Sequence, residues 1–224
     1  MKSSVFVKLS MLFFVLLTSS YSHAQSEFPQ VTVEGLQLIN SSELAVVYAL
    51  PDADLGQYSK IYLLDTKVSF KKNWRRDQNR NKVYKVKASE MASMKLELAE
   101  LFQQVFMEVL RDGGYQLVTS PGDDVLLIKP AIINLDIVAA DTMSASNVRT
   151  YSETAGEMTL YLELYDSVSN QLIAKALDQQ KDRRTGYFQW QNRVTNRAAA
   201  RRIIKVWADV LKQGLDQARG VTTR

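Results

Sequence analysis

The chain has 224 residues and a net charge of +4, with no cysteine and with His23 as its one histidine. The side chains that most often carry acid–base, thiol or transition-metal chemistry are therefore nearly absent, and neither a cofactor nor a metal site is predicted. The small net charge also argues against a nucleic acid as the partner.

Residues 1–24 predict a secretory signal peptide. They have a basic start, a mainly apolar run over residues 9–17, and small side chains at Ser22 and Ala24, where a signal peptidase would cut. Cleavage near Ala24 places the mature protein in the periplasm.

The predicted mature chain is a single domain over residues 25–224, which is long enough to enclose a sizeable core. A membrane-spanning helix needs about 20 apolar residues, and the apolar run of the leader is shorter than this. No later segment is long and apolar enough to span a membrane, so no transmembrane segment is predicted in the mature chain. Loss of Lys2 and Lys8 lowers the net charge from +4 to +2. Without a cysteine, the mature chain has no lipobox to carry a lipid anchor.

The first third of the mature chain predicts short strands and one polar connection. Short strands are expected at residues 31–33 and 44–47, and a longer one at residues 60–70, which are rich in β-branched and aromatic side chains. Residues 71–82 are strongly charged, with Trp74 as almost their sole large apolar side chain, and predict an exposed loop.

A long amphipathic helix is predicted next. Ser89 is a suitable N-cap, and Gly113 with Gly114 is the expected stop after Asp112. Apolar residues recur in steps of three and four, so one face of the helix packs against an apolar surface. These residues are Met91, Met94, Leu98, Leu101, Phe102, Val105 and Val109.

The second half predicts strands and a final helix. Strands are expected at residues 115–119 and 125–139, the latter interrupted at Pro130, which indicates an edge strand or a bulge. Residues 156–165 alternate strictly between apolar and polar side chains, which is typical of an antiparallel sheet with one wet face. The list of elements is completed by a hairpin turn at 166–170, a strand at 172–177 and an amphipathic helix at 195–218.

This order of elements predicts an α+β fold. Two amphipathic helices and a mostly antiparallel (mixed) sheet with one solvent-exposed face fit a two-layer sandwich, in which both helices cover the other face of the sheet. The hairpin argues against an all-parallel doubly wound sheet.

No motif predicts catalysis. Ser69 and Lys72 match the S-x-x-K pattern of serine acyl-transferases, but they lie at a strand end, and neither S-D-N nor K-T-G follows. A second possibility is a pair of carboxylates that act together as in a glycosidase, for which two side chains must converge in one cleft. The candidates are Asp123, Asp124, Asp136, Glu153 and Glu157.

Two clusters of arginine and aromatic residues predict a binding surface. Arginine supplies bidentate donors, and tryptophan and tyrosine supply rigid contact area, so interfaces favour this combination. The alternative is that the aromatic side chains close one end of the core while the arginines are solvated. The predicted binding residues are Trp74, Arg75 and Arg76 in the first cluster and Arg183, Arg184, Tyr187 and Trp190 in the second.

Several runs of the sequence resemble a family of bacterial cell-envelope proteins known as a domain of unknown function, whose members are commonly described as lipoproteins. The resemblance covers roughly residues 30–218 and implies an α/β-type envelope domain without a known activity. The runs that carry it are residues 58–63, 68–80, 114–118, 124–131, 155–167 and 190–198.

These features predict a non-enzymatic binding module that recognises an envelope protein or an anionic envelope component. Two other functions remain open. One is a carboxylate-dependent hydrolase acting on envelope glycan or peptide, and the other is a small-ligand carrier with a pocket between the sheet and the helices.

Overall fold

The computed structural model describes residues 28–40, 43–80, 85–138, 150–152, 156–181, 189–191 and 193–221. The predicted signal peptide lies outside these residues. So do the arginines and the tyrosine of the second cluster, Arg183, Arg184 and Tyr187.

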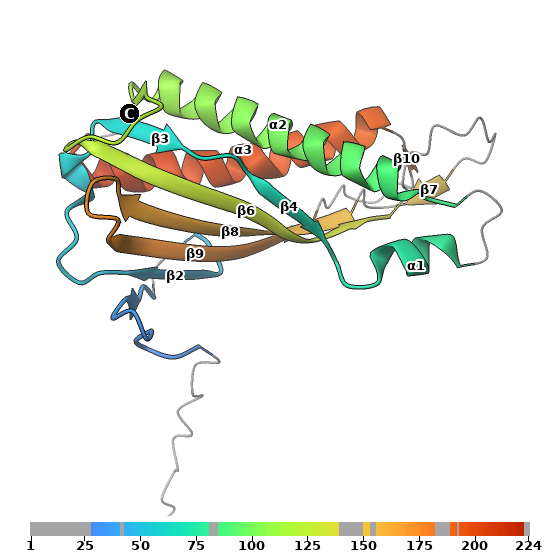
Figure 1. Ribbon diagram of the computed structural model, residues 1–224, viewed down its shortest axis with the longest axis horizontal. Coiled ribbons are helices and arrows are strands. Elements are labelled where there is room, and N and C mark those ends of the chain that lie inside the picture. The colour runs from blue at the N-terminus through green and yellow to red at the C-terminus, as the bar shows by residue number, and fades with distance from the viewer. Residues whose placement is uncertain are drawn as a thin grey trace, which may run out of the picture.

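Eight of the described strands form one mixed sheet (Figure 1). Seven of them follow the order β1-β2-β9-β8-β6-β3-β5, and β4 pairs with β6 on the same side as β3. Strands β1, β2, β9, β8 and β6 pair antiparallel, whereas β3 and β4 pair parallel with β6, and β3 pairs parallel with β5. The predicted α+β class with a mostly antiparallel, mixed sheet is confirmed. The bounds are β1 Gln37–Leu38, β2 Val46–Ala49, β3 Lys60–Leu63, β4 Lys67–Phe70, β5 Gln116–Leu117, β6 Val125–Ile137, β8 Gly156–Asp166 and β9 Leu172–Lys181.

Two long helices, α2 (Ala88–Asp112) and α3 (Arg193–Ala218), cover one face of this sheet (Figure 1). The predicted N-cap of α2, Ser89, is wrong: the N-cap is Lys87, two residues earlier, and the carboxylate of Glu90 accepts the backbone N–H of Lys87 at 2.7 Å. Gly113 and Gly114 end it as predicted, the latter with a φ of +82°. The other elements are a 3-10 turn, η1 (Leu55–Gln57), a short helix, α1 (Trp74–Asn79), and a two-stranded sheet of β7 (Thr150–Ser152) and β10 (Gln189–Gln191).

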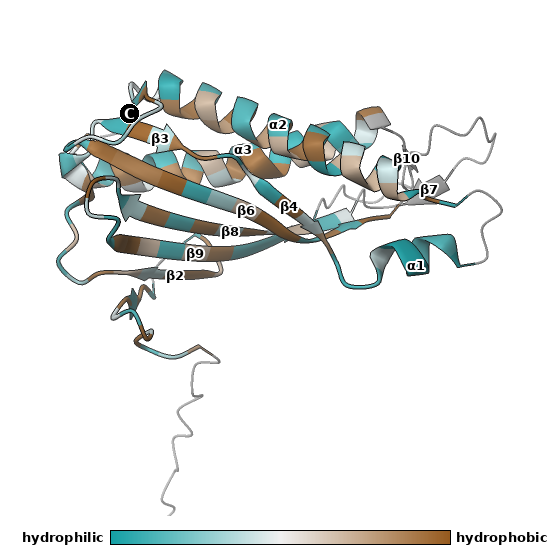
Figure 2. Ribbon diagram, viewed as in Figure 1, coloured by the Kyte–Doolittle hydropathy of each residue, from teal (hydrophilic) through white to brown (hydrophobic). Residues whose placement is uncertain are grey.

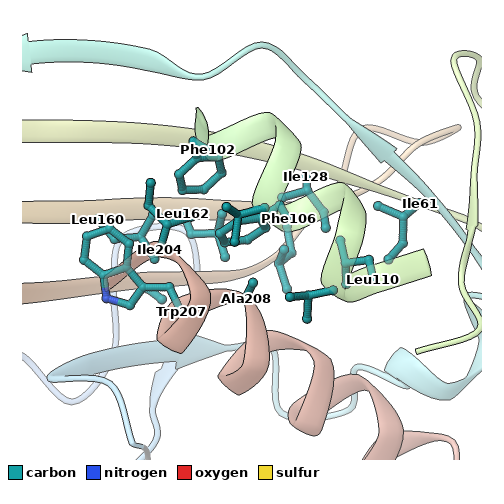
Figure 3. Close-up of a cluster of buried hydrophobic side chains, with 14 of the residues drawn as sticks. Ile61, Phe102, Phe106, Leu110, Ile128, Leu160, Leu162, Ile204, Trp207 and Ala208 are labelled. Atoms are coloured by element: carbon teal, nitrogen blue, oxygen red, sulfur yellow. The ribbon is translucent and has the colours of Figure 1, made fainter. Parts of the chain in front are cut away.

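The core lies between the helices and the sheet (Figure 3). Phe102 and Phe106 of α2 stack with ring centroids 4.0 Å apart, and Trp207 of α3 is 1 % exposed. The indole Nε1 of Trp207 donates to the buried carboxylate of Asp178 on β9 at 2.7 Å. Since Asp178 also accepts the backbone N–H of Ala45 at 3.0 Å, one carboxylate joins α3 to two neighbouring strands.

The predicted alternation in β8 is confirmed. Met158, Leu160, Leu162 and Leu164 are buried on the helix side of the sheet. On the other side, Tyr161, Glu163 and Tyr165 are half-buried. Glu163 accepts the hydroxyls of both tyrosines at 2.7 and 3.0 Å and contacts Lys129 Nζ at 2.8 Å.

The predicted strand over residues 60–70 is wrong in one respect, because the structure divides it into β3 and β4. The N–H of Leu64 donates to the carbonyl of Ile128, so Ile128 and, two residues on, Pro130 face this neighbour. Proline has no N–H to offer. Pairing therefore stops opposite Pro130 and resumes at Lys67, while β6 stays paired to β8 on its other side. The predicted interruption of the strand itself is wrong, because β6 runs through Pro130, which pairs with Leu162 of β8. The proline interrupts only the pairing on the β3 and β4 side, and β6 is not an edge strand.

A β-bulge at Asn134, whose φ is +52°, changes the direction of the side chains near the end of β6. Register shifts occur there against both β4 and β8. Before the bulge even-numbered residues such as Ile132 face the core, whereas after it Leu135 does so, at 5 % exposed. An extra residue in one strand has this effect because side chains alternate with a period of two.

Two further predictions about local structure are wrong. Residues 31–33 lie in a turn rather than a strand, in which Gly35 donates to the carbonyl of Thr32 and Val31 forms an isolated bridge to Gln37. Residues 71–82, predicted as a loop, contain helix α1. Its sequence has no amphipathic period to reveal it, and Trp74 is its one buried side chain.

Gly156, at the start of β8, predicts a test of the bulged segment. Its φ is +147°, and a Cβ there would lie 2.1 Å from the carbonyl oxygen of Asp136. Gly156→Ala should therefore lower the free energy of unfolding by about 2 kcal/mol or more in urea titrations. Gly214→Ala is the matched control, because a Cβ added at this helical position would have no neighbouring atom within 4 Å outside the adjacent helix backbone. It should raise the free energy of unfolding by about 0.5–1 kcal/mol. Equal effects of the two substitutions would contradict this account.

Candidate functional site

A basic groove lies between α1 and the first turns of α2. Among the described residues, six cationic side chains and no carboxylate line it. Helix α1 is hydrophilic along its length (Figure 2), so it presents charge to solvent. The cations of the groove are Lys71, Arg75, Arg76, Arg80, Lys85 and Lys95.

Trp74 fixes α1 to the sheet. Its side chain is 4 % exposed and stacks on Phe70 of β4, with ring centroids 4.2 Å apart. The indole Nε1 donates to the carbonyl of Ile137 at 3.1 Å, and Gln78 Nε2 donates to the same oxygen at 3.0 Å. Both ends of the short helix are thereby held to the end of β6, although a helix of this length has little stability alone.

A pair of hydrogen bonds fixes the approach to α2 beside α1. The backbone N–H of Val86 donates to Asn79 Oδ1 at 2.7 Å, and Asn79 Nδ2 donates to the carbonyl of Val86 at 3.2 Å. Val86 is itself buried at 4 % exposed. The two walls of the groove are therefore joined by direct contacts.

The groove keeps a positive charge. Asp77 contacts Arg76 at 3.3 Å and Arg80 at 3.2 Å, with the side chains of both arginines about two-thirds exposed. Lys71 is hydrogen-bonded to Asp136 at 2.9 Å, which raises the pKa of its ammonium group and keeps it protonated. The exposed carboxylate of Asp77 therefore contacts two of the arginines, and the groove has more cations than carboxylates in contact with them.

The structure describes four of the seven predicted binding residues. Arg75 and Arg76 are exposed on α1, whereas the indole of Trp74 is buried and supports them from below. Trp190 lies in β10 opposite Tyr151 of β7, toward the same end of the long axis as α1 (Figure 1). Arg183, Arg184 and Tyr187 lie outside the described residues.

Sequence reasoning missed Arg80, Lys85 and Lys95 as members of the groove. The signal for Arg80 was its spacing of four from Arg76, which places both on one side of a helix. Because residues 71–82 were expected to form a loop, this spacing did not predict that the two side chains share a face. Lys95 belongs to α2, and only the folded chain brings it into the same groove lining as the residues of α1.

Of the described candidate carboxylates, Asp136 and Glu157 come together. They are register partners on β6 and β8, and both contact Lys71, at 2.9 and 3.6 Å. Asp123 and Asp124 lie just before the opposite end of β6, where Ser59 Oγ donates to Asp124 at 2.6 Å. The described residues include no group of three or more acidic, histidine or cysteine side chains that could hold a metal ion.

The family model described as "Protein of unknown function (DUF3313)" matches residues 25–211. The chain belongs to the DUF3313 family. The resemblance found in the sequence is thereby confirmed, and the description of DUF3313 names no catalytic residue. No curated protein matches the sequence of this DUF3313 member.

Solved structures similar to this DUF3313 chain have low sequence identity. They include the PelC dodecamer from Paraburkholderia phytofirmans, with 11 % identity, 74 % of this chain and 96 % of that chain covered, and a TM-score of 0.40. A minor lipoprotein from Acinetobacter baumannii has 10 % identity over 72 % of this chain and 95 % of that chain, with a TM-score of 0.36. Within the described part of the DUF3313 chain, no helix is long and apolar enough to cross a membrane.

Trp74→Ala tests whether the indole holds α1 in place. Loss of the stacking and of the hydrogen bond to Ile137 should release the helix, so backbone amides of residues 74–79 should exchange with deuterium at least tenfold faster. Arg75→Ala removes an exposed side chain of the same helix and should leave exchange nearly unchanged. Unchanged protection in the Trp74 variant would show that α1 is held by other contacts.

Proposed function

We propose that this protein is a non-enzymatic binding module of the bacterial cell envelope and that the basic groove is its binding site. The observation that carries the proposal is the lining of the groove, where the described part of the chain supplies six cations and no carboxylate. Arginine and lysine attract carboxylate and phosphate groups, and arginine binds them with two parallel hydrogen bonds. The partner is therefore an anionic protein surface or an anionic envelope component.

The way in which α1 is held supports a binding role. Arg75 and Arg76 follow directly on Trp74, whose indole is buried and hydrogen-bonded. Their backbone is thereby fixed before any partner arrives, which lowers the entropy cost of binding. The guanidinium groups stay exposed to solvent and accessible to a partner.

Export to the periplasm is part of the proposal. It rests on the basic, apolar and small-residue segments of residues 1–24. The match to the family model begins at residue 25, directly after the proposed cleavage site. Replacement of the apolar run by polar residues should keep the protein in the cytoplasm, as fractionation would show.

Charge reversal in the groove tests the binding site. The Arg75→Glu/Arg76→Glu variant should bind heparin or phosphatidylglycerol vesicles about tenfold more weakly than the wild type, because two cations become anions in the groove. The binding should also weaken as salt is raised. Titration with each probe, beside phosphatidylcholine vesicles as the uncharged surface, measures both effects.

Arg202→Glu/Lys205→Glu is the matched control. It changes the net charge by the same amount on exposed positions of α3, away from the groove. If the control loses as much affinity as the groove variant, then binding follows net charge alone and the groove is not the site.

The second cluster extends the proposal to Arg183, Arg184, Tyr187 and Trp190. If both clusters form one surface, Arg183→Ala/Arg184→Ala should weaken heparin binding a further three- to tenfold beyond the effect of Arg75→Ala/Arg76→Ala. If the Arg183→Ala/Arg184→Ala variant binds heparin as tightly as the wild type does, then the site is confined to the groove beside α1.

A further inference from the structure

The outer edge of β4 leads into the basic groove. Strand β4 pairs with β6 on one side, and none of the described strands pairs with it on the other. The backbone N–H of Lys71, directly after β4, donates to the carbonyl of Leu135 on β6 at 3.0 Å. Because the backbone groups of successive strand residues point to opposite sides, the N–H and C=O of Val68 and Phe70 point away from β6. Such an edge is a template for another strand.

The space beside this edge is continuous with the groove. Phe70 and Lys71 line the groove at the end of β4, and Lys95 lines it from α2. Before the start of β4 the helix contacts the sheet, where Gln103 Nε2 donates to the carbonyl of Leu64 at 2.6 Å. A strand added to β4 would therefore lie on the α2 side of the sheet, with one end in the groove.

The charges along this path favour an acidic strand. Lys67 is exposed on β4, and Arg75, Arg76 and Lys95 line the groove at the other end. Lys71 is already paired with Asp136, so these four cations carry the selection. Cross-strand neighbours of opposite charge stabilise a sheet, whereas like charges destabilise it.

We infer that the groove receives an extended acidic peptide segment of a partner protein, which adds as a strand to the outer edge of β4. Its backbone pairs with Val68 and Phe70, and its carboxylates meet Lys67 and the cations of the groove. In strand addition the main-chain hydrogen bonds supply affinity and the side chains supply specificity. This inference rests on the proposed function, because it names the partner of the same groove.

Two N-methylated peptides test the strand pairing. A fluorescent peptide of about seven residues, in which glutamate alternates with valine, should bind to the full mature chain and raise the fluorescence anisotropy. Every second N–H of a paired strand faces its neighbour, so N-methylation of either the valines or the glutamates should weaken binding at least tenfold, while methylation of the other set should change it little. Equal affinities of the two methylated peptides would overturn the inference.

Heparin separates this inference from the proposed function. If heparin binds through Arg75 and Arg76 but the acidic peptide does not bind, then strand addition is wrong and the groove remains a binding site for another anion. If neither heparin nor the peptide binds, both proposals are wrong.

Val68→Pro tests the position of the added strand. Proline removes an N–H that points away from β6, and such an edge position tolerates it. Binding of the acidic peptide should fall at least tenfold below that of Val68→Ala, the matched control that keeps the N–H, while heparin should bind equally to both. Equal binding of the peptide to the two folded variants would overturn the inference. If Val68→Pro does not fold, the methylated peptides decide.

Lys67→Gln tests the charge beside the edge. Because Lys67 is exposed on β4 but outside the groove lining, its loss should weaken the acidic peptide two- to fivefold and leave heparin binding unchanged. Lys60→Gln is the matched control and should change neither, since β5 already occupies the place beside β3. Equal losses of peptide affinity in the two variants would show that the peptide does not follow β4 and would overturn the inference.

Discussion

The bulge at Asn134 in β6 is the constraint on which the basic groove and an apolar pocket between α2, α3 and the end of β6 both depend. It turns the last residues of the strand by one position, so that Leu135 faces the core and lines the apolar pocket. The same turn brings Asp136 to Lys71 and the carbonyl of Ile137 to the indole of Trp74. Without the extra residue, alternation would send these groups to the opposite faces of the sheet. The bulge therefore positions the floor of the groove and the wall of the pocket together.

The first turns of α2 separate the groove from the pocket by the helical period. Met91 and Lys95 point toward the groove beside α1, whereas Met94 and Leu98 line the pocket. Lys71, which lines the groove, contacts Asp136 of β6 and Glu157 of β8, whose strand neighbours Leu135 and Met158 line the pocket. Both hollows lie away from the centre of the core, where Trp207 and Asp178 join the helices to the sheet. Substitutions in the groove can thus change binding without removing the contacts that hold the two layers together.

Sequence patterns predicted most of the fold because they report local periodicity. The alternation of residues 156–165 and the steps of three and four in α2 each identify an element and its buried face, and both were confirmed. The predictions that were wrong concern non-local contacts. Helix α1 depends on the contacts that Trp74 makes with Phe70 and with the carbonyl of Ile137, and the division of residues 60–70 depends on Pro130 in another strand. Neither cause is visible within the segment that it shapes.

The sequence by itself determined most of the long elements, the α+β class, the family and the excess of cations near residues 71–76. Spacing along a chain fixes which side chains share a face of a helix or strand, and these features need nothing more. Only the tertiary structure decided that residues of α1 and of the first turns of α2 line one basic groove and that an apolar pocket lies between α2, α3 and the end of β6. Lys71 and Asp136 are 65 positions apart, and no local pattern encodes their contact. Such contacts depend on how complete layers pack and on where a strand bulges, so they arise only in the folded chain.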